Sequence, residues 1–315
     1  MLGVLLSQGC GVGSDGDGAK SGKEASAASR AADLGAPTSV DSLPLGGFFS
    51  AEATSRGFIV QAEQRALAVC MGEKGFKYRP LPPPIPEEEL TGRVGLADAN
   101  AAASSGYLRK SVLQAEAQPQ ERDFVPRDPA ERDAYTSALL GTPAAVKGAR
   151  ETKDALEKKY GIKVESFPER LPSGCQAEIR DRVYGGTPNY VEYWFLRSVL
   201  EGLGIDATQA VRASQRKEAL DRSWAACMGA KGFTDASDPI RYAVRQWPEP
   251  RPGKEEIVTA MADVECKEQT GYAASVLELH SREQGRLLDG KLGVLERYGE
   301  LREQVEARAR EALGF

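Results

Sequence analysis

Two short strings decide the fold of this chain, Ala68-Val-Cys-Met-Gly-Glu-Lys-Gly-Phe76 and Ala225-Ala-Cys-Met-Gly-Ala-Lys-Gly-Phe233. They share the pattern Cys-Met-Gly-x-Lys-Gly-Phe and lie about half a chain apart, so we interpret them as two copies of one module. A segment with apolar residues at helical spacing leads into each Cys. Gly75 and Gly232 can each supply the left-handed residue that ends a helix, and the following Phe can fold back onto the last turn. The pattern therefore predicts two helices that end in the same way.

Helical spacing continues through most of the chain, and little of it alternates with the period of two that strands require. The sequence therefore predicts a mostly α fold. Asp128 and Pro129 are typical of the start of a helix, as N-cap and first-turn residue. Residues 91–105 are small and rich in Ala and Gly, so we expect a loop there. Helices are expected over residues 49–75, 146–160, 171–184, 190–201 and 207–229, and a long helical stretch over 253–315, where several Gly residues can interrupt it.

Five Cys and one His stand in 315 residues, and four of the Cys accompany the repeat. Four Cys allow three disulfide connectivities, and the repetition favours pairing within each copy, Cys70 with Cys175 and Cys227 with Cys266. A four-thiolate zinc site would require closely spaced Cys pairs, which the chain lacks, so we expect no metal and no cofactor. Reduced, buried Cys in a cytosolic protein remain the alternative to disulfides.

These motifs carry a resemblance. The Cys-Met-x-x-x-Gly-Phe helix end, the string Ala262-Asp-Val-Glu-Cys266-Lys and the string Asp128-Pro-Ala-Glu-Arg-Asp-Ala-Tyr135 resemble secreted or lipid-anchored proteins of high-GC, Streptomyces-like actinobacteria. The resemblance covers most of residues 55–300, although only through short motifs. It implies an exported, disulfide-bonded helical protein, and it implies no activity and no catalytic residues.

The first residues are similar to the signal peptide and lipobox of a bacterial lipoprotein. An apolar run, Met1-Leu-Gly-Val-Leu-Leu6, is followed by Ser7-Gln-Gly-Cys10, and Gly, Ser and Ala dominate residues 11–39. We expect residues 1–10 to act as the export signal, Cys10 to carry lipid, and residues 11–47 to form a flexible tether. No Lys or Arg precedes the run, and Ser7 stands where Leu is preferred, so an unmodified Cys in an N-terminal tail is the alternative. Beyond the tether we expect a first helical Cys module over residues 48–205 and a second, with a long C-terminal helix, over residues 206–315.

Charge and residue usage exclude several function classes. The net charge of -5 argues against a nucleic-acid partner, because such proteins need a basic surface for the phosphates. The one aromatic cluster includes Tyr190 and Trp194, which share a helix face. We expect them to pack in the core, with stacking on a sugar ring of the cell wall as the alternative. His280 is the only imidazole and is expected to be a packed or exposed residue rather than a ligand, and we identify no catalytic residues.

From these observations we expect an exported protein anchored by lipid to the outer face of the cytoplasmic membrane. Its expected role is non-enzymatic, in binding an envelope protein or a cell-wall partner or as an accessory. Two alternatives stay open: an extracytoplasmic hydrolase that acts on cell-wall glycans, and an accessory component of an export system.

Overall fold

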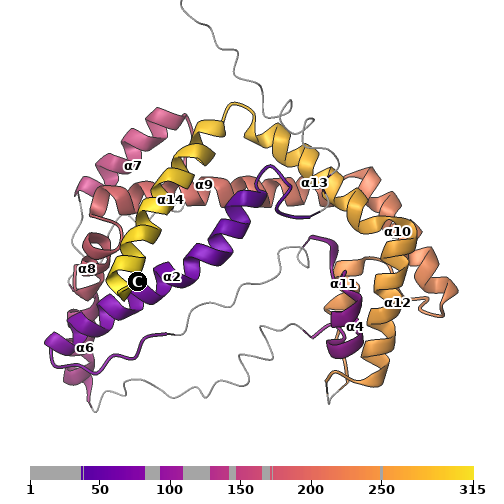
Figure 1. The fold of residues 1–315 in the computed structure, drawn as a ribbon, viewed down its shortest axis with the longest axis horizontal. Helices are drawn as coiled ribbons and strands as arrows, with labels where there is room; N and C mark the ends of the chain where they lie inside the picture. The colour runs from indigo at the N-terminus through magenta and orange to yellow at the C-terminus, as the bar shows by residue number, and fades with distance from the viewer. Residues whose placement is uncertain are drawn as a thin grey trace, which may run out of the picture.

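The computed structural model describes residues 37, 39–81, 93–108, 128–141, 147–164, 171, 173–248 and 251–315. Over these ranges the protein is all-helical, as predicted, and its helices form two lobes (Figure 1). None of the helices in this part of the chain is long and apolar enough to span a membrane. Cys10, the expected export signal and most of the expected tether lie outside the described residues.

The first lobe is built around a core shared by its long helices. Phe195, Leu196, Tyr298 and Leu301 are fully buried in this core, together with apolar residues from the neighbouring helices. The aromatic residues supply much of the buried apolar area that stabilises the lobe. The lobe consists of α2 (Gly46–Glu73), α6 (Pro129–Leu140), α7 (Lys147–Tyr160), α8 (Cys175–Arg182), α9 (Thr187–Arg212) and α14 (Leu292–Leu313).

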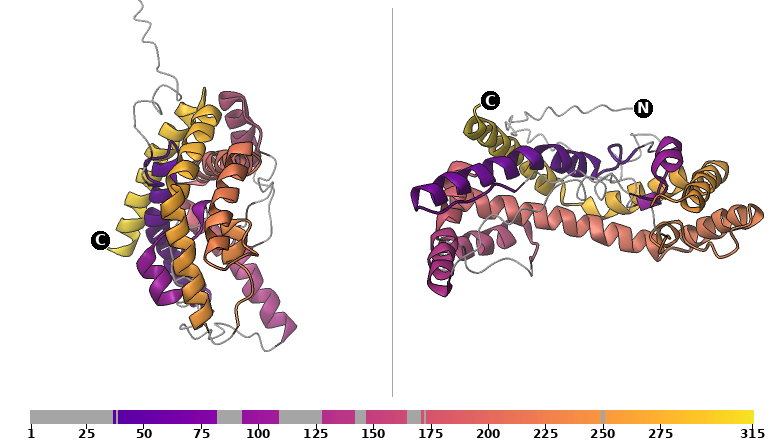
Figure 2. Two further views of the ribbon diagram at one scale, coloured as in Figure 1. Left: turned by 90° about the vertical axis from the view of Figure 1, so that its right-hand side faces the viewer. Right: turned by 90° about the horizontal axis from the view of Figure 1, so that it is seen from below.

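The second lobe has a smaller core, in which Trp224, Met228, Tyr272 and Val276 are fully buried. The lobe consists of α4 (Ala99–Ser105), α10 (Gln215–Ala230), α11 (Pro239–Ala243), α12 (Lys254–Thr270) and α13 (Tyr272–Leu288). The two lobes are joined where α13 packs along α9, as the views in Figures 1 and 2 show.

Each lobe contains one helix from the other predicted module, 48–205 or 206–315. Helix α14, which follows the second Cys motif, packs against α2 and α9 of the first lobe. Helix α4, which precedes the second motif by more than a hundred residues, packs against α12 of the second lobe. The two halves of the chain are therefore interleaved rather than arranged as successive units.

Both disulfides have the predicted pairing. Cys70 is bonded to Cys175 with 5.6 Å between their Cα atoms, and Cys227 to Cys266 with 5.7 Å, both in the usual range. The bonds close loops of 105 and 39 residues. Stable disulfides are typical of proteins that fold in an oxidising, extracytoplasmic compartment, so the structure indicates such a location.

The two helix ends that carry the repeated motif are also confirmed. Gly75 and Gly232 have φ values of +83° and +94°, the left-handed region in which glycine is favoured. The residue after each glycine donates its backbone N–H to the Met carbonyl oxygen five residues earlier, at 2.9 Å for Phe76 and 3.0 Å for Phe233. This hydrogen bond closes a turn of six residues and is typical of helices that end with a left-handed glycine, the Schellman motif.

The structure corrects the last part of the loop expected over residues 91–105, because residues 99–105 form α4. Asp98 accepts hydrogen bonds from the backbone N–H groups of Asn100 and Ala101, at 2.7 and 3.0 Å, and so caps α4. The stretch that follows is rich in Ala, the residue with the highest helix propensity, so it continues as a helix once it is capped. The content of small residues alone favours a loop here.

Two further segments differ from expectation. Residues 39–47, expected in the tether, are packed, because Val40 and Leu43 lie against Leu277 of α13. Helix α9 continues to Arg212, past the end expected at residue 201, and the ring of Phe49 fills the space that a side chain at position 204 would need. The expected interruption of the C-terminal stretch is confirmed, since the stretch is three helices, separated at Gly271 and near residue 290.

The shared helix ends give a matched set of substitutions. Gly75→Ala and Gly232→Ala should each lower the free energy of unfolding by about 1 kcal/mol, because alanine is strained at positive φ. Gly72→Ala and Gly229→Ala, which lie inside α2 and α10 with open space around them, should raise it by up to about 1 kcal/mol. Urea denaturation measures all four. Equal stability of the two sets would contradict the role assigned to the motif.

Candidate functional site

The polar face of α12 is the most unusual feature of the second lobe. Glu256, Asp263 and Lys267 are only 1%, 0% and 2% exposed, although charged residues are seldom buried so completely. Their spacing places them on one side of the helix, with the small residue Ala260 between them. Burying such charges is costly unless each has partners, so the surroundings of this face must supply them.

Asp263 lies at the centre of the face and receives three hydrogen bonds. Trp224 Nε1 donates at 2.9 Å, Lys267 Nζ at 2.9 Å and the Tyr107 hydroxyl at 3.1 Å. Burial raises the pKa of Asp263, and the charge of Lys267 opposes that rise. Burial also lowers the pKa of Lys267, and Asp263 opposes this change in turn. The two residues form a buried ion pair that is further satisfied by hydrogen bonds.

The partners of this face come largely from one segment, residues 93–108, which we call the strap. At its first end, Lys267 Nζ donates a hydrogen bond to the Leu96 carbonyl oxygen at 2.7 Å. At its second end, the Tyr107 backbone N–H donates to Glu256 Oε1 at 3.0 Å. Arg251 pairs with the same carboxylate, with Nη2 2.6 Å and Nε 3.1 Å from its oxygens. The strap therefore caps both ends of the polar face.

Two glycines allow the strap to approach these charges. Gly95 and Gly106 have positive φ values of +73° and +56°. A Cβ atom on Gly95 would lie 2.9 Å from Lys267 Nζ, and one on Gly106 would lie 2.8 Å from Glu256 Cγ. Both positions need glycine for conformation and for space.

Aromatic and cationic groups stack beside the strap. The ring of Tyr107 stacks on Trp247, with 5.4 Å between centroids. The Arg245 guanidinium lies 4.1 Å from the Trp247 centroid on one side and 4.3 Å from the Tyr242 centroid on the other. Cation–π contacts of this kind are attractive, so Arg245 helps to hold the rings beside Tyr107 without a further buried carboxylate.

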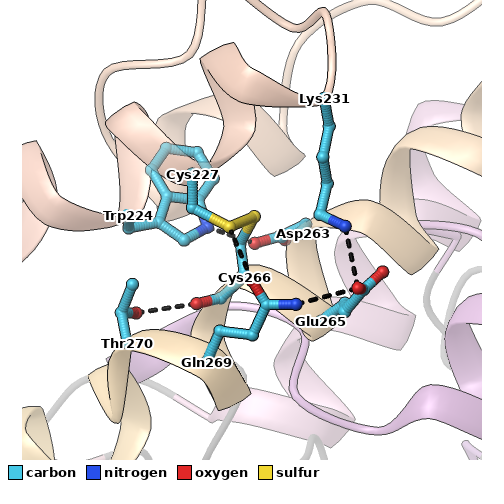
Figure 3. Close-up of a disulfide and its surroundings, with 8 residues drawn as sticks. All are labelled: Trp224, Cys227, Lys231, Asp263, Glu265, Cys266, Gln269 and Thr270. Atoms are coloured by element: carbon cyan, nitrogen blue, oxygen red, sulfur yellow. Dashed lines mark hydrogen bonds and ion pairs between the residues drawn. A yellow bond between two sulfur atoms is a disulfide. The ribbon is translucent and has the colours of Figure 1, made fainter.

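The second disulfide fixes the position of this site (Figure 3). Trp224 is three residues before Cys227 on α10, and Asp263 is three residues before Cys266 on α12. The disulfide and the Trp224–Asp263 hydrogen bond are therefore two links between the same helices, one helical turn apart. Around them, Lys231 of the motif pairs with Glu265 at 2.8 Å.

The first copy of the motif lacks the polar link. Leu67 occupies the place three residues before Cys70 that Trp224 occupies before Cys227. Leu67 is buried against Cys70, Met71 and Cys175, and Phe76 and Tyr135 pack on the same cluster. The polar site is therefore specific to the second copy.

The predicted aromatic residues Tyr190 and Trp194 lie elsewhere, on α9 in the first lobe. Both are partly buried against the core, and their ring centroids are 6.2 Å apart. The Arg197 guanidinium lies 4.7 Å from the Trp194 ring, and Tyr184 meets Tyr190 edge to face at 4.9 Å. Contacts within the chain thus already cover part of both rings.

His280 is buried on α13 beside the strap. Its Nδ1 lies 3.3 Å from Arg93 Nη1, and burial together with nearby Arg93 lowers its pKa to about 4. The imidazole is therefore neutral near pH 7 and accepts a hydrogen bond from Arg93. The described residues contain no group of three or more His, Cys, Asp or Glu placed to hold a metal ion.

Comparisons with known proteins add no relative. No model of a known protein family, no curated protein and no solved structure matches this chain.

Sequence reasoning identified the disulfides but missed Trp224, Asp263 and the strap. One signal was present, since Trp224 and Asp263 stand at the same distance before the two Cys that the repeat pairs. The disulfide brings the two helices together at Cys227 and Cys266 but does not set the direction in which they run, so the partnership of Trp224 with Asp263 is known only from the structure.

A pair of matched substitutions tests the polar link. Trp224→Phe and Trp247→Phe delete the same atoms, but Trp224 Nε1 donates to a buried carboxylate, whereas Trp247 Nε1 is buried and has no hydrogen-bond partner among the described residues. Trp224→Phe should therefore cost about 1.5–3 kcal/mol more stability, the usual range for a hydrogen bond to a charged group. Urea denaturation gives both values. Equal losses would show that the link contributes nothing.

The buried imidazole should make stability depend on pH. As pH falls from about 6.5 to about 4, the unfolded chain protonates this group before the folded protein does. The free energy of unfolding should then fall by about 3 kcal/mol from His280 alone. His280→Asn should remove this contribution, so the difference in stability between wild type and variant should narrow over that interval. A difference that is constant with pH would overturn the assignment.

Proposed function

We propose that this chain is an exported protein of the bacterial envelope, held on the outer face of the cytoplasmic membrane by lipid on Cys10. Its proposed role is non-enzymatic, in binding an envelope protein or a cell-wall partner. The observation that carries the proposal is the pair of disulfides, because such bonds persist outside the reducing cytoplasm. The lipobox-like string Ser7-Gln-Gly-Cys10 adds the anchor.

The state of the buried charges argues against catalysis by these residues. A general acid or base must come within hydrogen-bond reach of its substrate. Glu256, Asp263 and Lys267 are almost fully buried, and groups of the same chain already occupy them. Their arrangement is suited to holding the strap and α10 in place.

The anchor is tested by metabolic labelling with an alkyne analogue of palmitate in an actinobacterial host. The wild-type protein should carry the label and sediment with membranes, whereas Cys10→Ala should lose both properties. Non-reducing peptide mapping should still find the Cys70–Cys175 and Cys227–Cys266 bonds in Cys10→Ala, which controls for folding. A wild-type protein without label, or label that persists in Cys10→Ala, would refute the lipid anchor.

The binding role is tested separately with purified protein and isolated cell walls, and by crosslinking in native envelopes. We expect retention on the wall or a reproducible crosslinked envelope protein, without release of soluble sugar fragments. Fragment release would contradict the non-enzymatic role. Failure of both retention and crosslinking would contradict the binding role itself.

A further inference from the structure

The second lobe binds both ends of the strap through main-chain groups, and Val94 of the strap is buried in its core. Lys267 Nζ binds the Leu96 carbonyl oxygen at 2.7 Å, and Glu256 Oε1 accepts the Tyr107 N–H at 3.0 Å. These two charged residues lie three turns apart on α12 and hold the two ends of the segment that contains α4. Recognition by main-chain groups at both ends is typical of a groove that binds a short peptide.

Side chains of the strap add specificity to this docking. Between the ends, Ala102 is fully buried in a small cluster with Ala260 and Val264 of α12, so the helix axes can approach closely. At the second end, the Tyr107 hydroxyl donates to Asp263, and its ring stacks on Trp247. We define the strap groove as the surface formed by Glu256, Ala260, Asp263, Val264, Lys267 and Trp247. It selects a one-to-two-turn helix with a small buried face, followed by Gly-Tyr.

Every residue of the strap groove belongs to the second half of the chain, whereas the strap belongs to the first half. The stretches that join the strap to its neighbours, residues 82–92 and 109–127, lie outside the described structure. Their 11 and 19 residues could span roughly 36 and 63 Å at full extension. A strap can therefore reach the groove of another molecule that lies within these distances.

We propose that the strap groove also binds the strap of a second copy of this chain, giving a dimer in which two molecules exchange residues 93–108. The same hydrogen bonds, stacking and buried alanines form within one molecule and between two, so exchange needs no new contact. Docking within one molecule is favoured at low concentration, because the linkers give the chain's own strap a high effective concentration. The exchanged dimer should therefore form when copies are concentrated. This inference does not depend on the lipid anchor or on a wall partner.

Cysteine trapping tests the exchange in the full chain, with Cys10→Ser as background. Ala102→Cys is placed in one population and Ala260→Cys in another, since both alanines are buried in the same cluster. The populations are unfolded in urea with the native disulfides intact, mixed, and refolded at high concentration before mild oxidation. The mixture should give a covalent dimer that neither population gives alone. The double variant Ala102→Cys/Ala260→Cys should give an internal bond and shows that the geometry permits one.

The control for position is Ser104→Cys, which is exposed on α4, mixed with Ala260→Cys. This pair should give no dimer above background. An internal bond in the double variant together with no dimer in the first mixture would overturn the proposal. Equal dimer from the Ser104→Cys mixture would overturn it as well, because the contact would then be nonspecific.

A second measurement avoids introduced cysteines in the groove. Native mass spectrometry of the Cys10→Ser chain, refolded at rising concentration, should show a dimer that increases with concentration. Gly106→Val should abolish that dimer, because its side chain would meet Glu256, which binds the second end of the strap. A chain that stays monomeric at every concentration, or a dimer that survives Gly106→Val, would overturn strap exchange.

Discussion

The second lobe depends on a double link between α10 and α12. The Cys227–Cys266 disulfide fixes the distance between the helices, and the Trp224–Asp263 hydrogen bond, one turn away, fixes the rotation of each helix about its axis. With both in place, the face of α12 that carries Asp263 points toward α10 and the strap, so the helix cannot turn its charges toward solvent without breaking the hydrogen bond.

Once that face is buried, the strap becomes necessary. Glu256, Asp263 and Lys267 lose their water, and a buried charge without partners costs several kcal/mol. The strap supplies one carbonyl oxygen, one backbone N–H and one hydroxyl to these three residues. The requirement for Gly95 and Gly106 follows from the same need, since these groups must come within hydrogen-bond distance of long charged side chains. The disulfide and the buried charges of α12 thus determine which residues are required in the strap, which is more than a hundred residues away in the sequence.

This dependence explains which features the sequence could predict. The helix ends at Gly75 and Gly232 are set by the repeated string, and the repetition favours pairing of each motif Cys with the next Cys along the chain, so both features could be predicted. The strap depends on which face of α12 is buried, and this is set by a contact across 156 residues between Tyr107 and Asp263. The Ala and Gly content of the strap favours a loop when the sequence is considered alone. In the structure these small residues allow close packing against α12, which can be recognised only when the partner helix is known. Tyr190 and Trp194 were placed correctly on one helix face, but their sequence carries no sign of Arg197 or Tyr184 covering them.

The first lobe shows the same interleaving in its core. Glu52 of α2 is buried and accepts hydrogen bonds from Arg197 Nε at 2.8 Å, from Tyr193 at 3.1 Å and from Tyr298 of α14. Since α14 is the last helix of the chain, this carboxylate gains its full set of partners only when the C-terminal residues are in place. The second lobe likewise needs the strap from the first half. A module built only from its own copy could fold as soon as it is synthesised. Here each lobe is complete only when a segment of the other module is in place. In each lobe, the disulfide therefore fixes a framework that a helix from the other module completes.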